Sequence, residues 1–196
     1  MRLGLYGGTF DPIHTAHLAV AEAAAAQFEL DKVLLIPNRV PPHKTEATVA
    51  SFEQRLRMVE LAVAGHLRLE ACDIERHEGK SYTIQTLETL RRTYGAGARF
   101  FFVIGADAFA EATTWHRAEE VFGLTECIGA ARPGYRYEIP AGAIVHRMDS
   151  TAFVESSTAL RLGMESGAVP EGVPSRVAQY IKEVGLYQQR GRVRSA

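Results

Sequence analysis

The chain has 196 residues, 46% of them hydrophobic, with 22 Lys and Arg residues against 23 Asp and Glu. This length fits one domain with a buried core, and the balanced charge excludes an overall attraction for nucleic acid or an anionic membrane. Cys72 and Cys127 are too few and too far apart for a disulfide framework or a zinc ribbon. We therefore expect reduced thiols in a cytoplasmic protein, and no apolar run approaches the roughly 20 residues that cross a membrane.

Short apolar runs alternate with helical patterns along the chain. The expected strands are residues 2–6, 31–37, 66–71, 98–107, 125–132 and 142–148. The expected helices are residues 17–28, 51–65, 83–94, 113–123, 157–167 and 175–187. Because the apolar runs are nearly continuous and alternate with helices, they predict an α/β fold whose parallel sheet has helices on both faces. We expect one domain over residues 1–187 and a basic, disordered tail over 188–196.

The stretch "GLYGGTFDPIHTAH" suggests a phosphate-binding turn. The first strand is expected to end at Tyr6, so that Gly7 and Gly8 let the backbone turn tightly and approach a ligand. A helix that begins near Thr15 presents a positive N-terminus to an anion. His14 and His17 share one side of its first turn. This stretch alone leaves open whether the histidines bind an anion or are neutral and hydrogen-bonded, and it is weak evidence for zinc.

Residues 37–50 form the longest irregular stretch, and their prolines prevent a regular helix or a central strand. A loop of this length in a compact domain is either disordered or functional. Because it follows the second expected strand, we expect it at the carboxyl edge of the sheet, where ligands bind in open α/β folds.

A second segment, "ESSTALR", repeats the same pattern of an anion-seeking helix start. Thr158 is the expected N-cap, and Arg161 takes the position that a capping box gives to Glu or Gln. Arg161 either pairs with Glu165 one turn later or binds a second phosphate group. Two such helix starts in one α/β chain predict a nucleotide polyphosphate as the ligand.

These motifs together resemble those of the bacterial nicotinate-nucleotide adenylyltransferases. "GGTFDPIHTAH" is similar to the family's G-G-T-F-D-P-x-H-x-G-H, and "SSTALR" is similar to S-S-T-x-x-R. "PNRVPPHK", "GKSYTIQTL" and "FFVIGADAF" followed by Trp115 occur in the family's order, so that the resemblance covers essentially the whole chain. The chain departs from the pattern at Ala16, where the family has Gly. That methyl group either crowds the triphosphate or packs between helix and sheet.

The resemblance implies a Rossmann-like nucleotidyltransferase fold with a small C-terminal helical part. It implies transfer of the adenylyl group of ATP to nicotinate mononucleotide in NAD biosynthesis, with Mg²⁺ bridging phosphate oxygens and no dedicated protein ligand for the metal. The partners are then ATP and the mononucleotide, without nucleic acid or membrane, and homo-oligomer formation is left open.

The resemblance also implies residue roles. The catalytic residues are His14, His17 and Arg161. The residues implied for ATP binding are Gly7, Gly8, Gly105, Asp107, Ser156, Ser157 and Thr158. The residues implied for the mononucleotide are Thr9, Phe10, His43, Lys44, Tyr82, Thr83 and Trp115.

Some of these roles have alternatives on the residues alone. Trp115 and Tyr82 offer aromatic faces to the cationic pyridinium, and the helix start "SYT" offers amides to its carboxylate. Asp107 is alternatively a helix N-cap, and His43 and Lys44 are alternatively part of a solvated loop. For Asp11 the sequence does not separate a capping role from a ligand role.

Two other functions compete with this interpretation. Phosphopantetheine adenylyltransferase of coenzyme A synthesis shares the two end motifs, but its substrate has no aromatic cation for Trp115. A non-catalytic nucleotide-binding module has no need of His14, His17 and Arg161 together, so their presence favours an enzyme.

Overall fold

The computed structural model describes residues 1–40, 48–77, 82–105, 112–130, 142–148, 156–168 and 170–188. One sheet contains the strands β1 (Arg2–Gly8), β2 (Lys32–Pro37), β3 (Leu69–Ala71), β4 (Arg99–Gly105), β5 (Glu126–Ala130) and β6 (Ile144–Met148). The helices are α1 (Thr15–Gln27), α2 (Phe52–Val63), α3 (Thr83–Tyr94), α5 (Ala118–Leu124), α6 (Ser157–Met164) and α7 (Ser175–Val184). A 3₁₀ turn, η1, covers Ala112–Thr114.

The strands lie in the order β3-β2-β1-β4-β5-β6, and every neighbouring pair is parallel. The chain therefore builds the sheet outward from β1 in one direction and from β4 in the other. In an open α/β sheet the crevice at such a reversal of strand order, at the carboxyl ends of the strands, is where ligands bind. The expected Rossmann-like fold is confirmed, and it places the candidate site beside the ends of β1 and β4.

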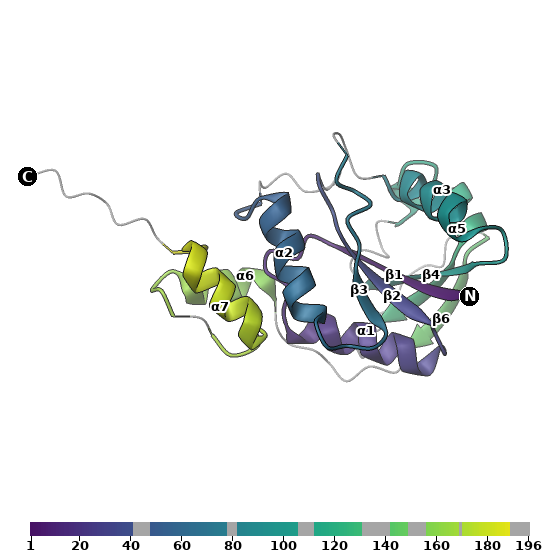
Figure 1. Cartoon of the computed structure of the whole chain (residues 1–196). Coiled ribbons are helices and arrows are strands. Elements are labelled where there is room, and N and C mark those ends of the chain that lie inside the picture. Colours follow the sequence, from purple (N-terminus) through teal and green to yellow (C-terminus); the bar gives the residue numbers. More distant parts are fainter. Residues whose placement is uncertain are drawn as a thin grey trace, which may run out of the picture.

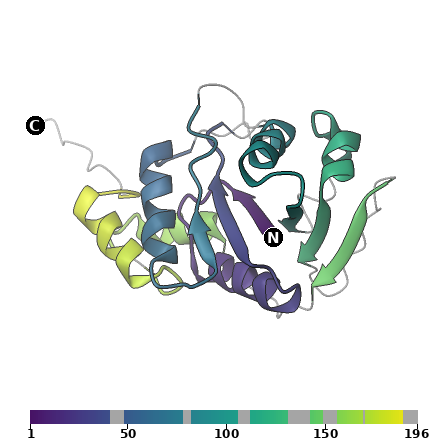
Figure 2. The same cartoon turned by 45° about the vertical axis from the view of Figure 1, so that its right-hand side comes forward.

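Helices cover both faces of the sheet (Figures 1 and 2), with α1, α2, α6 and α7 on one face and α3 and α5 on the other. Successive strand side chains alternate between the two cores: Val33 and Leu35 pack on the first face, and Leu34 and Ile36 pack on the second. Burial on both faces is the reason why the strands read as continuous apolar runs. The small C-terminal helical part, α6 and α7, packs against the α1 and α2 side.

Strand β1 is longer than the sequence predicts, and the expected end at Tyr6 is wrong. The strand continues through Gly7 and Gly8, because Gly8 still pairs with Pro37 of β2. A Cβ atom on Gly8 would lie 2.8 Å from the ring of Phe10. The chain reverses at Phe10, whose φ is +50°, and Gly8 gives its ring the space to fold back against the strand.

The single helix expected over residues 113–123 is also wrong. Trp115 follows η1, and α5 begins only at Ala118, after Arg117 with a φ of +56°. The Trp115 ring packs edge-on against Phe102 at 5.4 Å between ring centroids. The chain therefore bends at Trp115, whose indole is held by Phe102. A continuous helix does not allow this bend.

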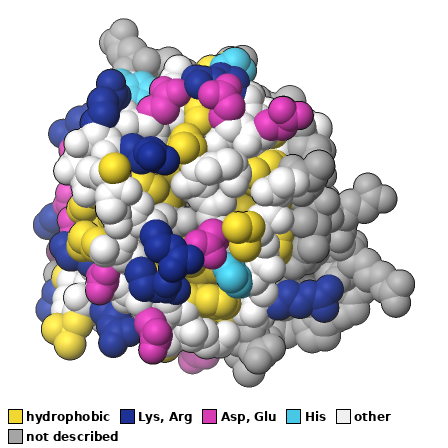
Figure 3. All heavy atoms as spheres, turned by 90° about the vertical axis from the view of Figure 1, so that its right-hand side faces the viewer, with side chains coloured by type: hydrophobic (Ala, Val, Ile, Leu, Met, Phe, Trp, Pro, Cys, Tyr) yellow, Lys and Arg dark blue, Asp and Glu magenta, His cyan; other side chains and the backbone are white. Residues whose placement is uncertain are grey.

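On the face shown in Figure 3, Lys and Arg side chains are interspersed with Asp and Glu. Ion pairs between elements join some of these charges, as Arg117 does with Glu88 of α3 at 2.9 Å. Among the described residues, every helix is too short or too polar to span a lipid bilayer.

Candidate active site

The two predicted histidines lie together at the start of α1. His14 is the N-cap residue, and the two rings are 3.7 Å apart between centroids. The main-chain N–H of His14 donates to Nδ1 of His17 at 3.3 Å. An Nδ1 atom that accepts a hydrogen bond bears no proton, so the neutral His17 ring carries its proton on Nε2. His17 is thus prepared to donate through Nε2 to an oxygen acceptor.

The surroundings of the histidines fix their orientation. The side chain of His14 is 4% exposed. His17 is half-buried, and its ring lies edge-on to that of Phe10 at 5.1 Å and tilted to that of Tyr6 at 6.0 Å. The ring carries a donor at the positive end of a helix dipole, which favours a negatively charged group next to it.

Helix α6 brings its own start to the turn that precedes α1. Arg161 donates to the main-chain carbonyl of Asp11 at 2.8 Å and to the Thr158 hydroxyl at 3.3 Å. The hydroxyl of Ser157 donates to the carbonyl of Pro12 at 3.0 Å. The two helix starts that the sequence predicts to attract anions therefore lie next to each other. The sequence alone does not require this proximity.

The predicted N-cap of α6 is wrong by two residues. Ser156 is the N-cap, and its hydroxyl oxygen accepts from the main-chain N–H of Ala159 at 3.2 Å. Ser156 has an extended backbone, whereas Thr158 is already inside the first helical turn. The exposed hydroxyl of Thr158 instead accepts from Arg161, which orients the guanidinium.

The residues predicted for the pyridine ring gather on the α3 side of the sheet. Tyr82 is the N-cap residue of α3, Thr83 is its first residue, and Trp115 is half-buried in the same apolar cluster as Tyr82. The ring of His116 lies tilted against that of Tyr82, at 4.7 Å between ring centroids. The sequence analysis did not single out His116, although His116 directly follows Trp115 in the sequence.

Four residues singled out in the sequence, His43, Lys44, Ser81 and Asp107, lie outside the described residues. Gly105 ends β4 at an exposed position at the carboxyl edge of the sheet. A Cβ atom at Gly7 would meet only ordinary contacts, the nearest at 3.5 Å from Asn38. Packing within the protein therefore does not require a glycine at position 7. Ala16 is 6% exposed, which supports the alternative that its methyl group packs within the protein.

Asp11 has a role that the sequence left undecided. Its carboxylate accepts hydrogen bonds from the main-chain N–H groups of Val49 and Ala50 at 2.8 and 3.1 Å, and from the Tyr187 hydroxyl at 2.7 Å. It does not cap α1, because His14 occupies that position. Asp11 instead fastens the turn after β1 to the end of the 37–50 segment and to the residues that follow α7.

Arg55 is a buried cation beneath the same turn, and the sequence analysis missed it. It is 0% exposed, and its guanidinium donates to the carbonyls of Thr9, Ala50 and Arg39 at 2.7, 3.3 and 3.4 Å. Burial lowers the pKa of Arg55, while the charge of Asp11 opposes that shift. A buried charge needs hydrogen-bond partners, and the carbonyl groups supply them for Arg55. Arg55 and Asp11 therefore both stabilise the turn.

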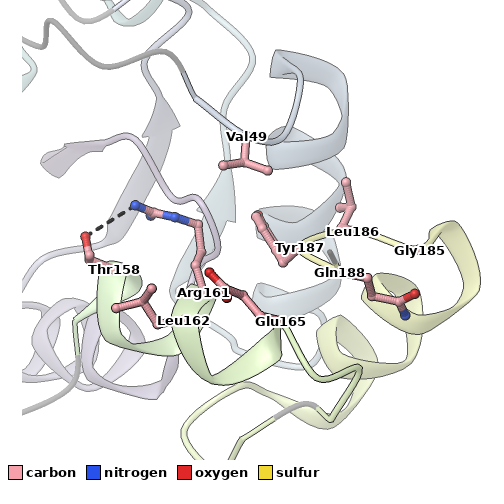
Figure 4. Close-up of a pocket in the computed structure, with 9 residues that line it drawn as sticks. All are labelled: Val49, Thr158, Arg161, Leu162, Glu165, Gly185, Leu186, Tyr187 and Gln188. Carbon is pink, nitrogen blue, oxygen red and sulfur yellow. Dashed lines mark hydrogen bonds between the residues drawn. The ribbon is translucent and has the colours of Figure 1, made fainter. Parts of the chain in front are cut away.

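A cavity of about 470 Å³ lies beside this turn (Figure 4). It is lined by Val49, Thr158, Arg161, Leu162, Glu165, Gly185, Leu186, Tyr187 and Gln188. The cavity therefore shares Arg161 and Thr158 with the predicted phosphate site. It extends from there to the chain beyond α7.

The described residues contain no group of three or more His, Cys, Asp or Glu side chains arranged to hold a metal ion. The guanidinium of Arg161, from α6, and the imidazole of His17, from α1, lie at this turn, and the carboxylate of Asp11 is engaged with Val49, Ala50 and Tyr187. This donor set suits an anion.

Comparison with known proteins agrees with this geometry. Residues 5–163 match the protein family described as cytidylyltransferase-like. A protein named "Probable nicotinate-nucleotide adenylyltransferase" from Solibacter usitatus is 43% identical over 187 residues, which are 95% of this chain and 100% of that protein. A protein of the same name from Exiguobacterium sibiricum is 43% identical over 189 residues, covering 95% of this chain and 99% of that protein.

Among solved structures, the nicotinic acid mononucleotide adenylyltransferase of Plasmodium falciparum complexed with NaAD superposes with a TM-score of 0.79. The match covers 95% of this chain and 97% of that one at 18% identity, so it shows the shared fold. Because the family match and the two 43% identical relatives together span nearly the full length, the chain belongs to the cytidylyltransferase-like family and, within it, to the nicotinate-nucleotide adenylyltransferases.

Proposed function

We propose that this chain transfers the adenylyl group of ATP to nicotinate mononucleotide, giving nicotinate adenine dinucleotide and pyrophosphate in NAD biosynthesis. The observation that carries the proposal is the meeting of two helix starts at one turn. His14 and His17 lie together at the start of α1, and Arg161 comes from α6. Arg161 donates a hydrogen bond to the main-chain carbonyl of Asp11, which lies in that turn. The names of the relatives agree with this activity.

The reaction needs little covalent chemistry from the protein. The second pKa of a phosphate monoester is about 6, so the mononucleotide phosphate is already charged at neutral pH and needs no general base. Its oxygen forms a bond to the α-phosphorus of ATP. The bond from that phosphorus to the bridging oxygen breaks, and the electron pair leaves with pyrophosphate. Positioning and charge stabilisation supply the rate enhancement.

His17 and Arg161 have different roles in this scheme. The Nε2–H of His17 donates to an oxygen of the α-phosphate, where negative charge shifts as the bond to the leaving group breaks. Arg161 has five N–H donors, and its contacts with Asp11 and Thr158 orient the guanidinium toward the β- and γ-phosphates. The dipoles of α1 and α6 add positive potential at the same place.

The other predicted residues complete the two substrate sites. The proposed ATP site contains Gly7, Gly8, Gly105, Asp107, Ser156 and Thr158. The hydroxyl of Ser157 instead donates to the main-chain carbonyl of Pro12 and so holds the turn. Thr9, His43 and Lys44 contact the mononucleotide phosphate. Phe10 contributes only main-chain atoms, because its side chain is buried.

The pyridinium ring stacks on Trp115 and Tyr82, and the main-chain N–H groups at the start of α3 bind its carboxylate. A divalent cation such as Mg²⁺ would enter with ATP, held by the substrate and water rather than by protein side chains, and would supply neutralisation of the triphosphate charge. The thiols of Cys72 and Cys127 are both free, which is consistent with the proposed cytoplasmic location.

A pyrophosphate-release assay tests the proposal. The purified protein is given ATP and Mg²⁺ with nicotinate mononucleotide, nicotinamide mononucleotide or phosphopantetheine. We expect release with the nicotinate substrate above all. Release with phosphopantetheine alone would instead assign the chain to coenzyme A synthesis, and binding of ATP without release from any of the three would indicate a non-catalytic module.

A further inference from the structure

One hydrogen bond joins the end of the chain to the turn at the active site. The hydroxyl of Tyr187 donates to Oδ1 of Asp11 at 2.7 Å, across 176 residues. Tyr187 is 8% exposed, so its side chain is enclosed by protein. The same carboxylate accepts from the main-chain N–H groups of Val49 and Ala50. Within the part of the chain that the structure describes, the Asp11 carboxylate accepts from three donors, and Tyr187 is the one side chain among them.

Asp11 is also the residue that orients Arg161. Its carboxylate contacts Tyr187 while its main-chain carbonyl accepts from Arg161 at 2.8 Å. Figure 4 shows Tyr187 and Arg161 both lining the cavity that Val49 borders. A displacement of Asp11 therefore moves an acceptor of Arg161, and it also moves the chain that leads to His14 three residues later.

The chain adopts a strained backbone to place Tyr187. Helix α7 ends at Val184, and its C-cap residue Gly185 has a φ of +64° and donates its N–H to the carbonyls of Ile181 and Lys182. Tyr187 then has a φ of +63°, in the left-handed region that residues other than glycine seldom occupy. Such a conformation persists only where the surrounding structure enforces it. The buried contact with Asp11 provides that enforcement.

The Tyr187 hydroxyl is protonated at neutral pH. Burial raises the pKa of Tyr187, and the negative charge of Asp11 raises it further. The phenol therefore stays protonated and keeps donating to the carboxylate.

We infer that Tyr187 is a positioning residue for adenylyl transfer, because its hydroxyl fixes Asp11 and through it the turn that carries Arg161 and the histidines. The inference rests on the proposed function. In this role the hydroxyl of Tyr187 acts through Asp11, to which it donates. Small errors in the placement of reacting groups lower the rate by up to about a hundredfold, so the loss of one buried anchor is expected to reduce turnover without abolishing it.

The test compares Tyr187→Phe with the matched variant Tyr180→Phe. Tyr180 lies on α7 and is half-buried against the same core, without a contact to Asp11. We expect Tyr187→Phe to lower kcat about tenfold while changing KM for nicotinate mononucleotide less than about twofold, and Tyr180→Phe to change neither. A hydroxyl that only stabilises the fold would lower the melting temperature of Tyr187→Phe and leave kcat of the folded protein unchanged, which would overturn the inference.

A double-mutant cycle with Asp11→Asn tests the route through Asp11. An amide in place of the carboxylate presents N–H donors to one of the main-chain N–H groups, so Asp11→Asn alone is expected to lower kcat at least as much as Tyr187→Phe. In the Asp11→Asn background, Tyr187→Phe should then have an effect below about twofold. If the losses in kcat of the two single variants simply multiply in the double variant, the inference is contradicted.

The single variant Asp11→Asn keeps the test decisive if Tyr187→Phe does not fold, because an unchanged kcat would reject the inference. If the unmodified protein does not transfer the adenylyl group at all, the proposed function fails first. If the unmodified protein is active and the variants have the same kcat, only the inference fails.

Discussion

The guanidinium of Arg161 donates a hydrogen bond of 2.8 Å to the main-chain carbonyl of Asp11, a residue 150 positions earlier in the chain. This contact joins the start of α6 to the turn between β1 and α1. Because the two helix starts attract the same kind of ligand, the proposed function treats their junction as one polyphosphate site rather than two separate anion sites.

Replacement of Arg161 tests whether this geometry matters beyond charge. Arg161→Lys keeps the positive charge, but a single ammonium cannot contact the Asp11 carbonyl and a phosphate pair with the planar geometry of a guanidinium. We expect kcat/KM for ATP to fall about tenfold or more in steady-state kinetics, and further in Arg161→Ala. The control Arg92→Lys changes an exposed arginine on α3 that donates to Thr89 of the same helix. Equal kinetics for Arg161→Lys and Arg92→Lys would contradict the assigned role.

His17→Ala tests donation to the transferred group. If Nε2 donates to charge that develops mainly in the transition state, kcat falls on the order of 10²–10³-fold and KM for ATP changes little. The control His66→Ala removes a partly exposed histidine that pairs with Glu22 at 2.6 Å, away from the turn. A loss below about threefold in the His17 variant, within the scatter of such measurements, would mean that the ring only packs between Tyr6 and Phe10.

Ala16→Gly distinguishes packing from crowding at the one position that departs from the family motif. Ala16 is buried in the first turn of α1, and Gly costs about 0.5–1 kcal/mol relative to Ala in a helix. We expect the free energy of unfolding, measured by urea titration, to fall by about that amount, with KM for ATP unchanged. A clearly lower KM for ATP in the glycine variant would show that the methyl group crowds the phosphates.

The sequence predicted the six strands, a parallel sheet and a helix that begins near Thr15, because continuous apolar runs and local helix signals are properties of neighbouring residues. It did not predict the extent of β1 through Gly8 or the break at Trp115, because both depend on aromatic rings that pack back from elsewhere in the chain. Local patterns cannot report such contacts.

The same distinction holds within the candidate site. The spacing of His14 and His17 places their rings on one helix turn, and the structure confirms this. Arg55 reads in the sequence as one more charge on an amphipathic helix, and Tyr187 reads as an aromatic near the C-terminus. Their roles arise from hydrogen bonds to the turn after β1, and those bonds span 46 and 176 residues.

The two cysteines should be unreactive in the folded protein. Burial raises the pKa of Cys127 to about 11, and burial likewise raises the pKa of Cys72. Because only the thiolate reacts, alkylation by iodoacetamide at pH 8 should be slow and should accelerate about tenfold per pH unit toward pH 11. Protein unfolded in guanidinium should react at both thiols. Fast labelling of the folded protein at pH 7 would contradict the buried, structural role of Cys127.

Selection of the acid over the amide mononucleotide tests the pocket at the start of α3. Both substrates share the pyridinium, so stacking on Trp115 and Tyr82 does not discriminate between them. Main-chain N–H groups at the helix start suit two carboxylate oxygens, whereas a carboxamide would place its own N–H donors against them. An unpaired buried donor costs about 1–3 kcal/mol, so kcat/KM should favour the acid at least about tenfold.

Trp115→Ala is the matched variant for this comparison. It should weaken kcat/KM for the acid and the amide alike and leave their ratio nearly unchanged, because in the proposed complex the indole stacks on the pyridinium ring that both substrates share. A ratio near one in the unmodified protein would reject the donor-only pocket, while adenylyl transfer itself would stand.

The most direct measurement of the central claim follows the α-phosphorus of ATP. The protein is incubated with Mg²⁺, nicotinate mononucleotide and ATP that carries a radioactive label at either the α- or the γ-phosphate, and the products are separated. We predict that the α label appears in nicotinate adenine dinucleotide and the γ label in pyrophosphate, in equal amounts and only when the mononucleotide is present. An α label that stays in ATP, or that enters a product only with phosphopantetheine, would contradict the account.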